Sequence, residues 1–244
     1  MISCDVVIIG AGPSGSSAAA VLAEKGHTVI LVERSKFPRY HVGESLLPFN
    51  SKILKRLGLL DKMRKSSFIK KNSVQFVDQE GIMSKPFYFN TRYPDELAQT
   101  WQVERAEFDT MLMETARQKG AFIMEETNVL SLIEENGKIL GLNALNQNKE
   151  YIEIRAKITL DCSGKVAFAA NRLGWRVRDP ELIKLLFGLI MKELPERLEL
   201  TKVLPQLPLH QRRVGFGIFH YRIIKLVLEL LLKVNIFLVL LKNI

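Results

Sequence analysis

The strongest constraint on the fold lies in residues 1–33, where a short β-branched run leads into a glycine-rich loop. Asp5–Ile9 is typical of a strand, the loop Gly10–Gly15 follows it, and Ser16–Lys25 is typical of an alanine-rich helix. A second strand, Thr28–Val32, then ends at Glu33. This order of strand, loop, helix, strand and acid is the fingerprint of a dinucleotide-binding unit. We therefore expect an α/β protein with a Rossmann-like parallel sheet.

Each glycine of this loop has its own mechanical purpose. Gly10 allows the tight turn, Gly12 lets backbone amides approach a pyrophosphate, and Gly15 lets the helix pack close to the strand. The helix N-terminus adds partial positive charge, and Glu33 would accept hydrogen bonds from an adenosine ribose. The loop alone does not distinguish FAD from NAD.

Three later segments resemble those of a known family. Gly43–Pro48 reads G-E-S-L-L-P, Arg105–Asp109 reads R-A-E-F-D in a helix that opens near Trp101 and runs to about Lys119, and Asp161–Gly164 reads D-C-S-G. These segments resemble flavin-dependent halogenases of the tryptophan halogenase-like type, within the FAD-dependent monooxygenase superfamily. The resemblance implies FAD as cofactor. It also implies a Rossmann-like, p-hydroxybenzoate hydroxylase-like FAD-binding domain with an incomplete β-rich substrate domain.

The resemblance extends the set of candidate cofactor residues. In the family, the arginine of R-x-x-F-D lies against the flavin, and the acid and glycine of the D-A-S-G segment face the cofactor, which indicates Arg105, Asp161 and Gly164 here. Without the family, Arg105 would be a surface cation paired with Glu104 or Glu107. The candidates together are Gly10, Gly12, Pro13, Ser14, Gly15, Glu33, Arg34, Gly43, Glu44, Ser45, Arg105, Asp161 and Gly164.

A lysine pair is the candidate for the chemistry. In halogenases of this kind, a buried lysine within G-F-x-x-K-x-G-A meets hypohalous acid and delivers the halogen to an aromatic ring, and the resemblance places Lys71 there. Ser67, Ser73 and Val74 stand where the family often has Gly, Gly and Ala, so a slip onto Lys70 stays open. An ordinary solvated strand edge is the other alternative. Burial would lower the pKa of the lysine and leave a nucleophilic neutral amine.

The resemblance implies an FAD-dependent halogenase or monooxygenase that uses reduced FAD, oxygen and halide. Its substrate would be an electron-rich aromatic small molecule, free or tethered to a carrier protein, and a separate flavin reductase would supply the reduced FAD. One alternative is a flavin monooxygenase or an isoprenoid (geranylgeranyl) reductase, neither of which would need Lys71. The other alternative is an inactive remnant.

Composition excludes some partners. The net charge of +9 is concentrated in residues 183–244, where ten Lys/Arg face four Glu, so residues 1–182 carry only +3 and show no basic stripe typical of nucleic-acid binding. Cys4 and Cys162 lack metal-ligand spacing, and we expect buried, reduced thiols. The N-terminus has neither a basic segment nor a cleavage site, which favours a strand in a cytoplasmic protein without a membrane partner.

The composition changes abruptly after Leu182. Residues 183–244 contain no Ala, Ser, Asp or Cys and are crowded with Leu, Ile and Lys, unlike an average soluble domain. When the implied codons are read one base out of register, Leu200–Gln206 can spell D-E-G-A-T-T and Arg213–His220 can spell G-W-F-W-Y-I-P. Both are family motifs, in the family's order, and neither occurs in the printed frame.

We therefore expect two regions. Residues 1–182 form the FAD-binding domain, with a halogenase-like insertion at about 43–100, and residues 183–244 are an out-of-frame tail on a truncated chain. The structural alternative is an interfacial membrane helix at Ile223–Leu241, whose Lys225, Glu229 and Lys233 would share one face.

Overall fold

The computed structural model describes three stretches of the chain: residues 1–76, 84–93 and 98–177. The chain divides into two compact units, one made of Met1–Ser73 with Phe87–Val177 and the other of Val74–Pro86 with Arg178–Ile244. The predicted out-of-frame tail, and the interfacial helix that is its alternative, lie outside the described residues. The first unit contains the glycine loop, Lys71 and the other candidate site residues.

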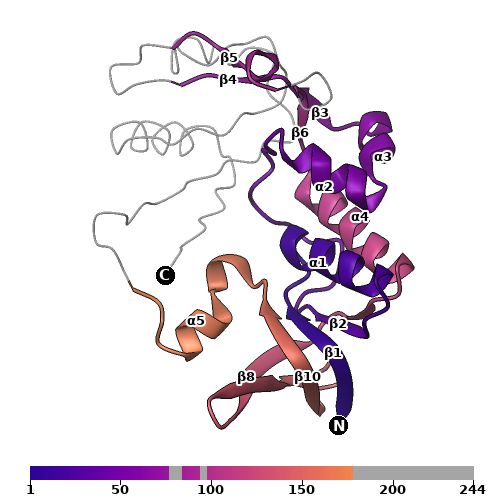
Figure 1. The fold of residues 1–244 in the computed structure, drawn as a ribbon, viewed down its shortest axis with the longest axis vertical. Helices are drawn as coiled ribbons and strands as arrows, with labels where there is room; N and C mark the ends of the chain where they lie inside the picture. The colour runs from indigo at the N-terminus through magenta and orange to yellow at the C-terminus, as the bar shows by residue number, and fades with distance from the viewer. Residues whose placement is uncertain (77–83, 94–97, 178–244) are drawn as a thin grey trace, which may run out of the picture. The chain divides into compact units, whose positions relative to one another are not determined.

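The largest described sheet of this unit has six strands and lies at the bottom of Figure 1. In spatial order its strands are β7 (Phe122–Met124), β2 (Val29–Val32), β1 (Ile2–Ile9), β10 (Tyr151–Asp161), β9 (Lys138–Leu145) and β8 (Asn128–Glu135). The first four strands run parallel, whereas β9 and β8 continue the sheet antiparallel. The expected Rossmann-like α/β fold is confirmed.

The remaining described elements are helices that follow strands of this sheet, together with the short helices and strands of the segment between β2 and α4. They are α1 (Pro13–Glu24), α2 (Asn50–Leu57), α3 (Leu60–Lys65), β3 (Ile69–Lys71), β4 (Ser73–Val74), β5 (Phe87–Tyr88), η1 (Phe89–Thr91), β6 (Thr100–Gln102), α4 (Arg105–Gln118), η3 (Gly164–Val166) and α5 (Phe168–Arg172). Strands β3 and β6 pair antiparallel. Within the described ranges, no helix has the length and apolar character needed to cross a bilayer.

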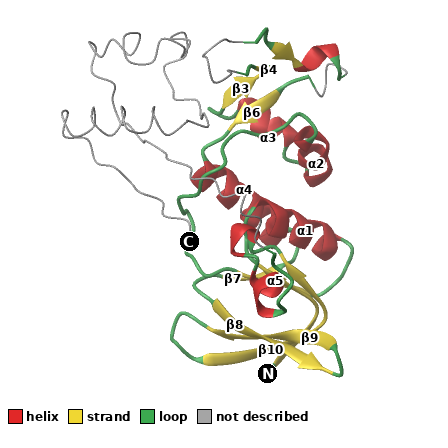
Figure 2. Ribbon diagram, turned by 90° about the vertical axis from the view of Figure 1, so that its left-hand side faces the viewer, coloured by secondary structure: helices red, strands yellow, loops and turns green. Residues whose placement is uncertain are grey.

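Alternation along β1 divides the core into two layers. Val6 and Ile8 are buried in the cluster that includes α1 and α4, two helices that lie side by side over the sheet (Figures 1 and 2). Val7 and Ile9 are buried in a second cluster with residues of β9 and β10. A strand that is buried on both faces has a continuous apolar sequence, which explains why this run of Val and Ile was recognisable.

Most of the expected elements are present, but the start of α4 is corrected. The helix begins at Arg105 and not near Trp101. Trp101 lies in strand β6 instead, where it pairs with Lys70 of β3 and its carbonyl accepts the Leu46 N–H at 3.0 Å, and the residue is 3% exposed. The expectation for the cysteines is also corrected, since Cys4 and Cys162 are free but only half-buried.

A surface cluster fastens the beginning of β1 to its neighbours. The Asp5 carboxylate accepts hydrogen bonds from Lys157 Nζ at 2.6 Å, Thr28 N–H at 2.9 Å and Thr28 Oγ1 at 2.8 Å. The hydrogen bonds from Lys157, and then from Thr28, hold the pKa of Asp5 below its ordinary value.

This cluster predicts an acid sensitivity. Because the folded-state pKa of Asp5 is depressed, its contribution to stability is complete above the unfolded pKa of about 4 and is lost as the pH falls below that value. We expect the midpoint temperature of Asp5→Asn to be lower than that of the wild type near pH 7, with the difference shrinking toward about pH 2. Calorimetry across this range checks it, and a constant difference would contradict it.

Candidate cofactor and lysine site

Two glycines of the loop are enclosed by protein atoms that leave no room for a side chain, whereas the third has free space beside its Cα. A methyl group on Gly15 would lie 1.9 Å from the Gly10 carbonyl oxygen, so α1 could not approach β1. Gly10 has φ +97°, and a methyl group there would lie 2.7 Å from the Cys162 carbonyl oxygen. At Gly12, by contrast, the nearest atom to such a methyl group is Arg39 Nη2, at 3.9 Å.

The first turn of α1 faces this open side. Gly12 is the N-cap, Pro13 occupies the first turn, and the helix begins with neither a side-chain cap nor an acidic residue. The first N–H groups of a helix lack partners within the helix, and the helix dipole adds positive potential there. Ser14, the next predicted residue, is exposed, and its hydroxyl lies 3.6 Å from Cys162 Sγ.

Glu33 joins the end of β2 to the glycine loop. Its Oε2 accepts the Ala11 N–H at 2.9 Å and its Oε1 accepts the Ser35 N–H at 3.0 Å, and the residue is 6% exposed. Each carboxylate oxygen can accept a further hydrogen bond. The acid therefore stabilises the loop and keeps acceptor capacity for a ligand.

Arg39 is a site residue that the sequence analysis did not identify. Its Nε and Nη1 are buried without a hydrogen-bond partner. Nη1 lies 3.3 Å from Asp109 Oδ2, Nε lies 3.8 Å from Glu33 Oε1, and the guanidinium lies over the Phe37 ring at 4.7 Å. A buried guanidinium with unused donors, beside the open face of Gly12, is a candidate ligand for an anion.

Arg105 fastens the segment after β2 to α4. Its Nε and Nη2 donate to the two oxygens of Asp109 at 2.7 and 2.8 Å, and its Nη1 donates to the carbonyls of Val42 and Gly43. Arg105 and Asp109 are both buried, so the surface pairing with Glu104 or Glu107 is not what the structure contains. Gly43 has φ +117°, and a methyl group there would lie 2.9 Å from Arg105 Nη1.

The end of β10 forms another wall of the loop. Cys162 N–H donates to the Ile9 carbonyl at 2.9 Å, which brings Asp161 and Gly164 near the glycine loop. The Asp161 carboxylate accepts the N–H groups of Ser163 at 2.9 Å and Ala169 at 2.7 Å. This acid therefore orders the turn that follows β10.

Lys71 lies on β3, and its amine reaches the G-E-S-L-L-P segment. Its Nζ donates to Ser45 Oγ at 2.6 Å and to the Leu46 carbonyl at 3.4 Å, and it lies 5.7 Å from the centre of the Phe89 ring. Burial lowers the pKa of the Lys71 amine. Lys70 is exposed, as alternation along a strand requires, so only Lys71 of the two is half-buried.

The predicted residues fall into two groups. The glycine loop, Glu33 and the turn after Asp161 surround the end of β1, while Ser45 and Lys71 lie together beside β6. Glu44, the middle residue of G-E-S, is half-buried, and its carboxylate accepts the Gly43 N–H at 3.0 Å. The segment from Gly43 to Ser45 therefore connects the two groups, with Arg105 holding its first end.

The first group fits a dinucleotide. The open face of Gly12, the uncapped first turn of α1 and the unused donors of Arg39 match a diphosphate in shape and charge. Together with the parallel sheet and the acid at the end of β2, they define a dinucleotide-binding fold. The profile of the FAD binding domain family matches residues 3–222, and the chain belongs to this family.

Individual relatives are halogenases. The 1H-pyrrole-2-carbonyl-(peptidyl-carrier protein) brominase of Pseudoalteromonas luteoviolacea is 35% identical over 170 residues, covering 70% of this chain and 40% of that protein. The 1H-pyrrole-2-carbonyl-(peptidyl-carrier protein) chlorinase of Pseudomonas fluorescens is 33% identical over 193 residues, covering 72% and 42%. The structure of the myxobacterial chondrochloren halogenase CndH matches with TM-score 0.62 and 35% identity, covering 66% of this chain and 37% of that chain.

These relatives confirm the resemblance to flavin-dependent halogenases and FAD as the cofactor. The chain spans about two fifths of the length of the curated relatives it matches.

Proposed function

We propose that FAD binds with its diphosphate against Gly12 and the first turn of α1, with Arg39 as a second source of positive charge. Glu33 accepts hydrogen bonds from the adenosine ribose through its remaining lone pairs. The turn after Asp161, with Gly164, borders the same loop. The observation that supports this placement is the contrast between Gly12, which is open, and Gly10 and Gly15, which are filled by protein atoms.

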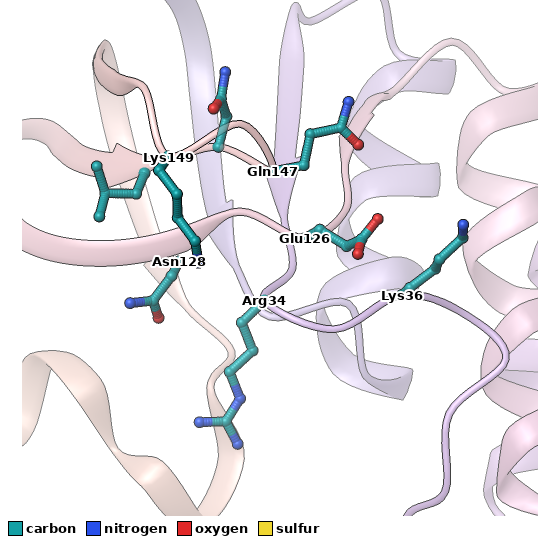
Figure 3. Close-up of a pocket in the computed structure, with 8 residues that line it drawn as sticks. Arg34, Lys36, Glu126, Asn128, Gln147 and Lys149 are labelled. Atoms are coloured by element: carbon teal, nitrogen blue, oxygen red, sulfur yellow. The ribbon is translucent and has the colours of Figure 1, made fainter.

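We further propose that the adenine lies in a pocket of about 260 Å³ (Figure 3). Arg34 follows Glu33 directly and borders this pocket, and a planar guanidinium can stack on a purine. The pocket is lined by Arg34, Lys36, Glu126, Asn128, Leu145, Asn146, Gln147 and Lys149.

Arg39 offers a test of the diphosphate placement. Loss of charge-assisted hydrogen bonds to a phosphate costs about 1.5–3 kcal/mol, so we expect Arg39→Met to raise the Kd for FAD about 10- to 100-fold. The free energy of unfolding without FAD should also fall, because the variant removes the cation that faces the buried carboxylates of Asp109 and Glu33, so the Kd is compared under conditions in which both proteins are folded. Flavin fluorescence titration and urea denaturation measure the two quantities. Equal FAD affinity in the variant would contradict the placement.

We propose that the protein is a flavin-dependent halogenase in which Lys71 carries the halogen. Bound reduced FAD, with oxygen and halide, supplies hypohalous acid. The neutral amine of Lys71 attacks the halogen, forming an N–halogen bond and releasing water. An electron-rich aromatic ring then takes the halogen from nitrogen and loses a proton, which returns the amine. The pKa of Lys71, lowered by burial, increases the fraction of neutral amine at a given pH.

The substrate we propose is a pyrrole-like aromatic acyl group tethered to a carrier protein, on the analogy of the brominase and chlorinase. A separate flavin reductase supplies the reduced FAD. Residues 183–244 are proposed to result from a lost base near codons 182 and 183, which makes the printed chain an inactive remnant of such an enzyme. Resequencing of the gene that finds the printed frame would remove this part of the proposal.

Two proteins test the function. One is the 244-residue chain as its sequence is printed, called the printed chain, and the other is the product of the gene with one base restored, called the restored enzyme. Each is supplied with FAD, a flavin reductase, NADH, bromide and pyrrole-2-carbonyl carrier protein, and the products are analysed by mass spectrometry. We expect bound flavin in both proteins and brominated pyrrole with the restored one. Hydroxylated product without bromination would indicate a monooxygenase. Absence of bound flavin from both proteins would contradict the proposed cofactor site.

A further inference from the structure

The amine of Lys71 is held mainly by one neighbour, the hydroxyl of Ser45. The distance of 2.6 Å from Nζ to Ser45 Oγ is short, whereas the Leu46 carbonyl is 3.4 Å away. No carboxylate in the described part of the chain lies within 4.0 Å of this amine. The hydroxyl is therefore its closest polar contact.

Backbone pairing fixes the hydroxyl in place. Leu46 N–H donates to the Trp101 carbonyl at 3.0 Å, Val103 N–H donates to the Glu44 carbonyl at 2.8 Å, and Ser45 forms an isolated bridge with Gln102. Gln102 also pairs with Ile69 of β3, the strand that contains Lys71. Both partners of the short hydrogen bond are therefore anchored to β6.

A hydroxyl suits this position better than a carbonyl or a carboxylate. It accepts a hydrogen bond from an ammonium group and can donate one to a neutral amine, whereas carbonyl and carboxylate oxygens only accept. The same neighbour can therefore hold the nitrogen in both protonation states. A lysine side chain has four rotatable bonds, so a single firm contact restricts its position considerably.

We propose that Ser45 is a positioning residue that holds the Lys71 amine through its hydroxyl in both the charged and the neutral state. This proposal rests on the proposed function of Lys71 and assigns Ser45 a role toward the amine in addition to its predicted role toward the cofactor. Ser45 also links the Lys71 amine to the proposed cofactor site. It is joined through Glu44 to Gly43, whose carbonyl accepts a hydrogen bond from Arg105.

The test is competitive acetylation of the printed chain with isotope-labelled acetic anhydride from about pH 7 to 11, with Lys71 and Lys70 quantified separately by mass spectrometry. Ser45→Ala removes the acceptor for the ammonium, so the pKa of Lys71 should fall further and its acetylation at about pH 8 should rise about 3-fold. Ser45→Thr keeps a hydroxyl and should restore the wild-type profile. Lys70 is the internal control.

An unchanged Lys71 profile in Ser45→Ala would overturn the proposal, as would equal changes at Lys70 and Lys71, or failure of Ser45→Thr to restore the profile in a folded protein. Circular dichroism establishes that each variant is folded. The measurement needs no flavin, halide or substrate, so it separates this proposal from the halogenase assignment. If the restored enzyme fails to halogenate but the acetylation result holds, only the proposed function is lost.

Discussion

Gly12→Ala yields a folded protein with a much lower affinity for FAD, whereas Gly15→Ala yields a strongly destabilised protein. The extra methyl group at Gly12 meets nothing closer than 3.9 Å, and Gly12 has φ −70°, which alanine adopts freely. The same methyl group would occupy the space through which a diphosphate approaches the backbone. We expect a rise of about 100-fold in the Kd for FAD, equivalent to about 3 kcal/mol.

At Gly15 the methyl group would overlap the Gly10 carbonyl oxygen at 1.9 Å. Overpacking of a core costs about 1–3 kcal/mol and more when backbone must move, against a total stability of about 5–15 kcal/mol. Circular dichroism, urea denaturation and flavin titration distinguish the variants. Gly26→Ala, at the far end of α1, is the control for backbone strain alone, because Gly26 has φ +85° and nothing lies within 4 Å of the added methyl group. We expect it to lose some stability and to keep the wild-type affinity for FAD. Normal FAD binding by folded Gly12→Ala would refute the cofactor placement.

Lys71→Ala abolishes halogenation and leaves flavin binding intact, while Lys70→Ala leaves both intact. The two lysines are adjacent on β3, but only Lys71 turns to Ser45 and is half-buried. Loss of the amine that carries the halogen should lower the rate of halogenation about 1,000-fold, within the range of about 10²- to 10⁴-fold for single catalytic groups. The measurement is the rate of brominated pyrrole formation by the one-base-restored enzyme, with oxygen consumption recorded in parallel.

Continued oxygen consumption with no brominated product is the expected signature of Lys71→Ala. If Lys70→Ala shows that signature and Lys71→Ala does not, the assignment is off by one residue. If both variants halogenate normally, the lysine has no part in the reaction.

The sequence was most informative where a pattern is local. The fingerprint from Asp5 to Glu33 predicted two strands, a helix and the acid at its end because each depends on neighbouring residues. The turn at Asn136–Gly137 is local in the same way, because Asn-Gly favours the positive φ that both residues have, at 52° and 72°.

The sequence was least informative where long-range contacts decide. Arg39 follows a proline in an apparently ordinary loop, and its burial depends on Asp109, which is 70 positions later. Trp101 was assigned to a helix because its pairing partners, near Leu46, are distant in the chain. The identity of the buried lysine depended on strand alternation in β3, a three-residue element too short to recognise from its pattern.

The neighbours of β1 have an implication for biosynthesis. Its partner on one side, β10, begins at Tyr151, and Ile2 pairs with Ile154. A nascent chain that grows by about 5–20 residues per second therefore holds β1 with one edge unsatisfied for roughly 8–30 seconds after it leaves the ribosome. During that interval an apolar strand with free amides is exposed to other chains. Other proteins in the cell can therefore contact β1 before β10 has been synthesised.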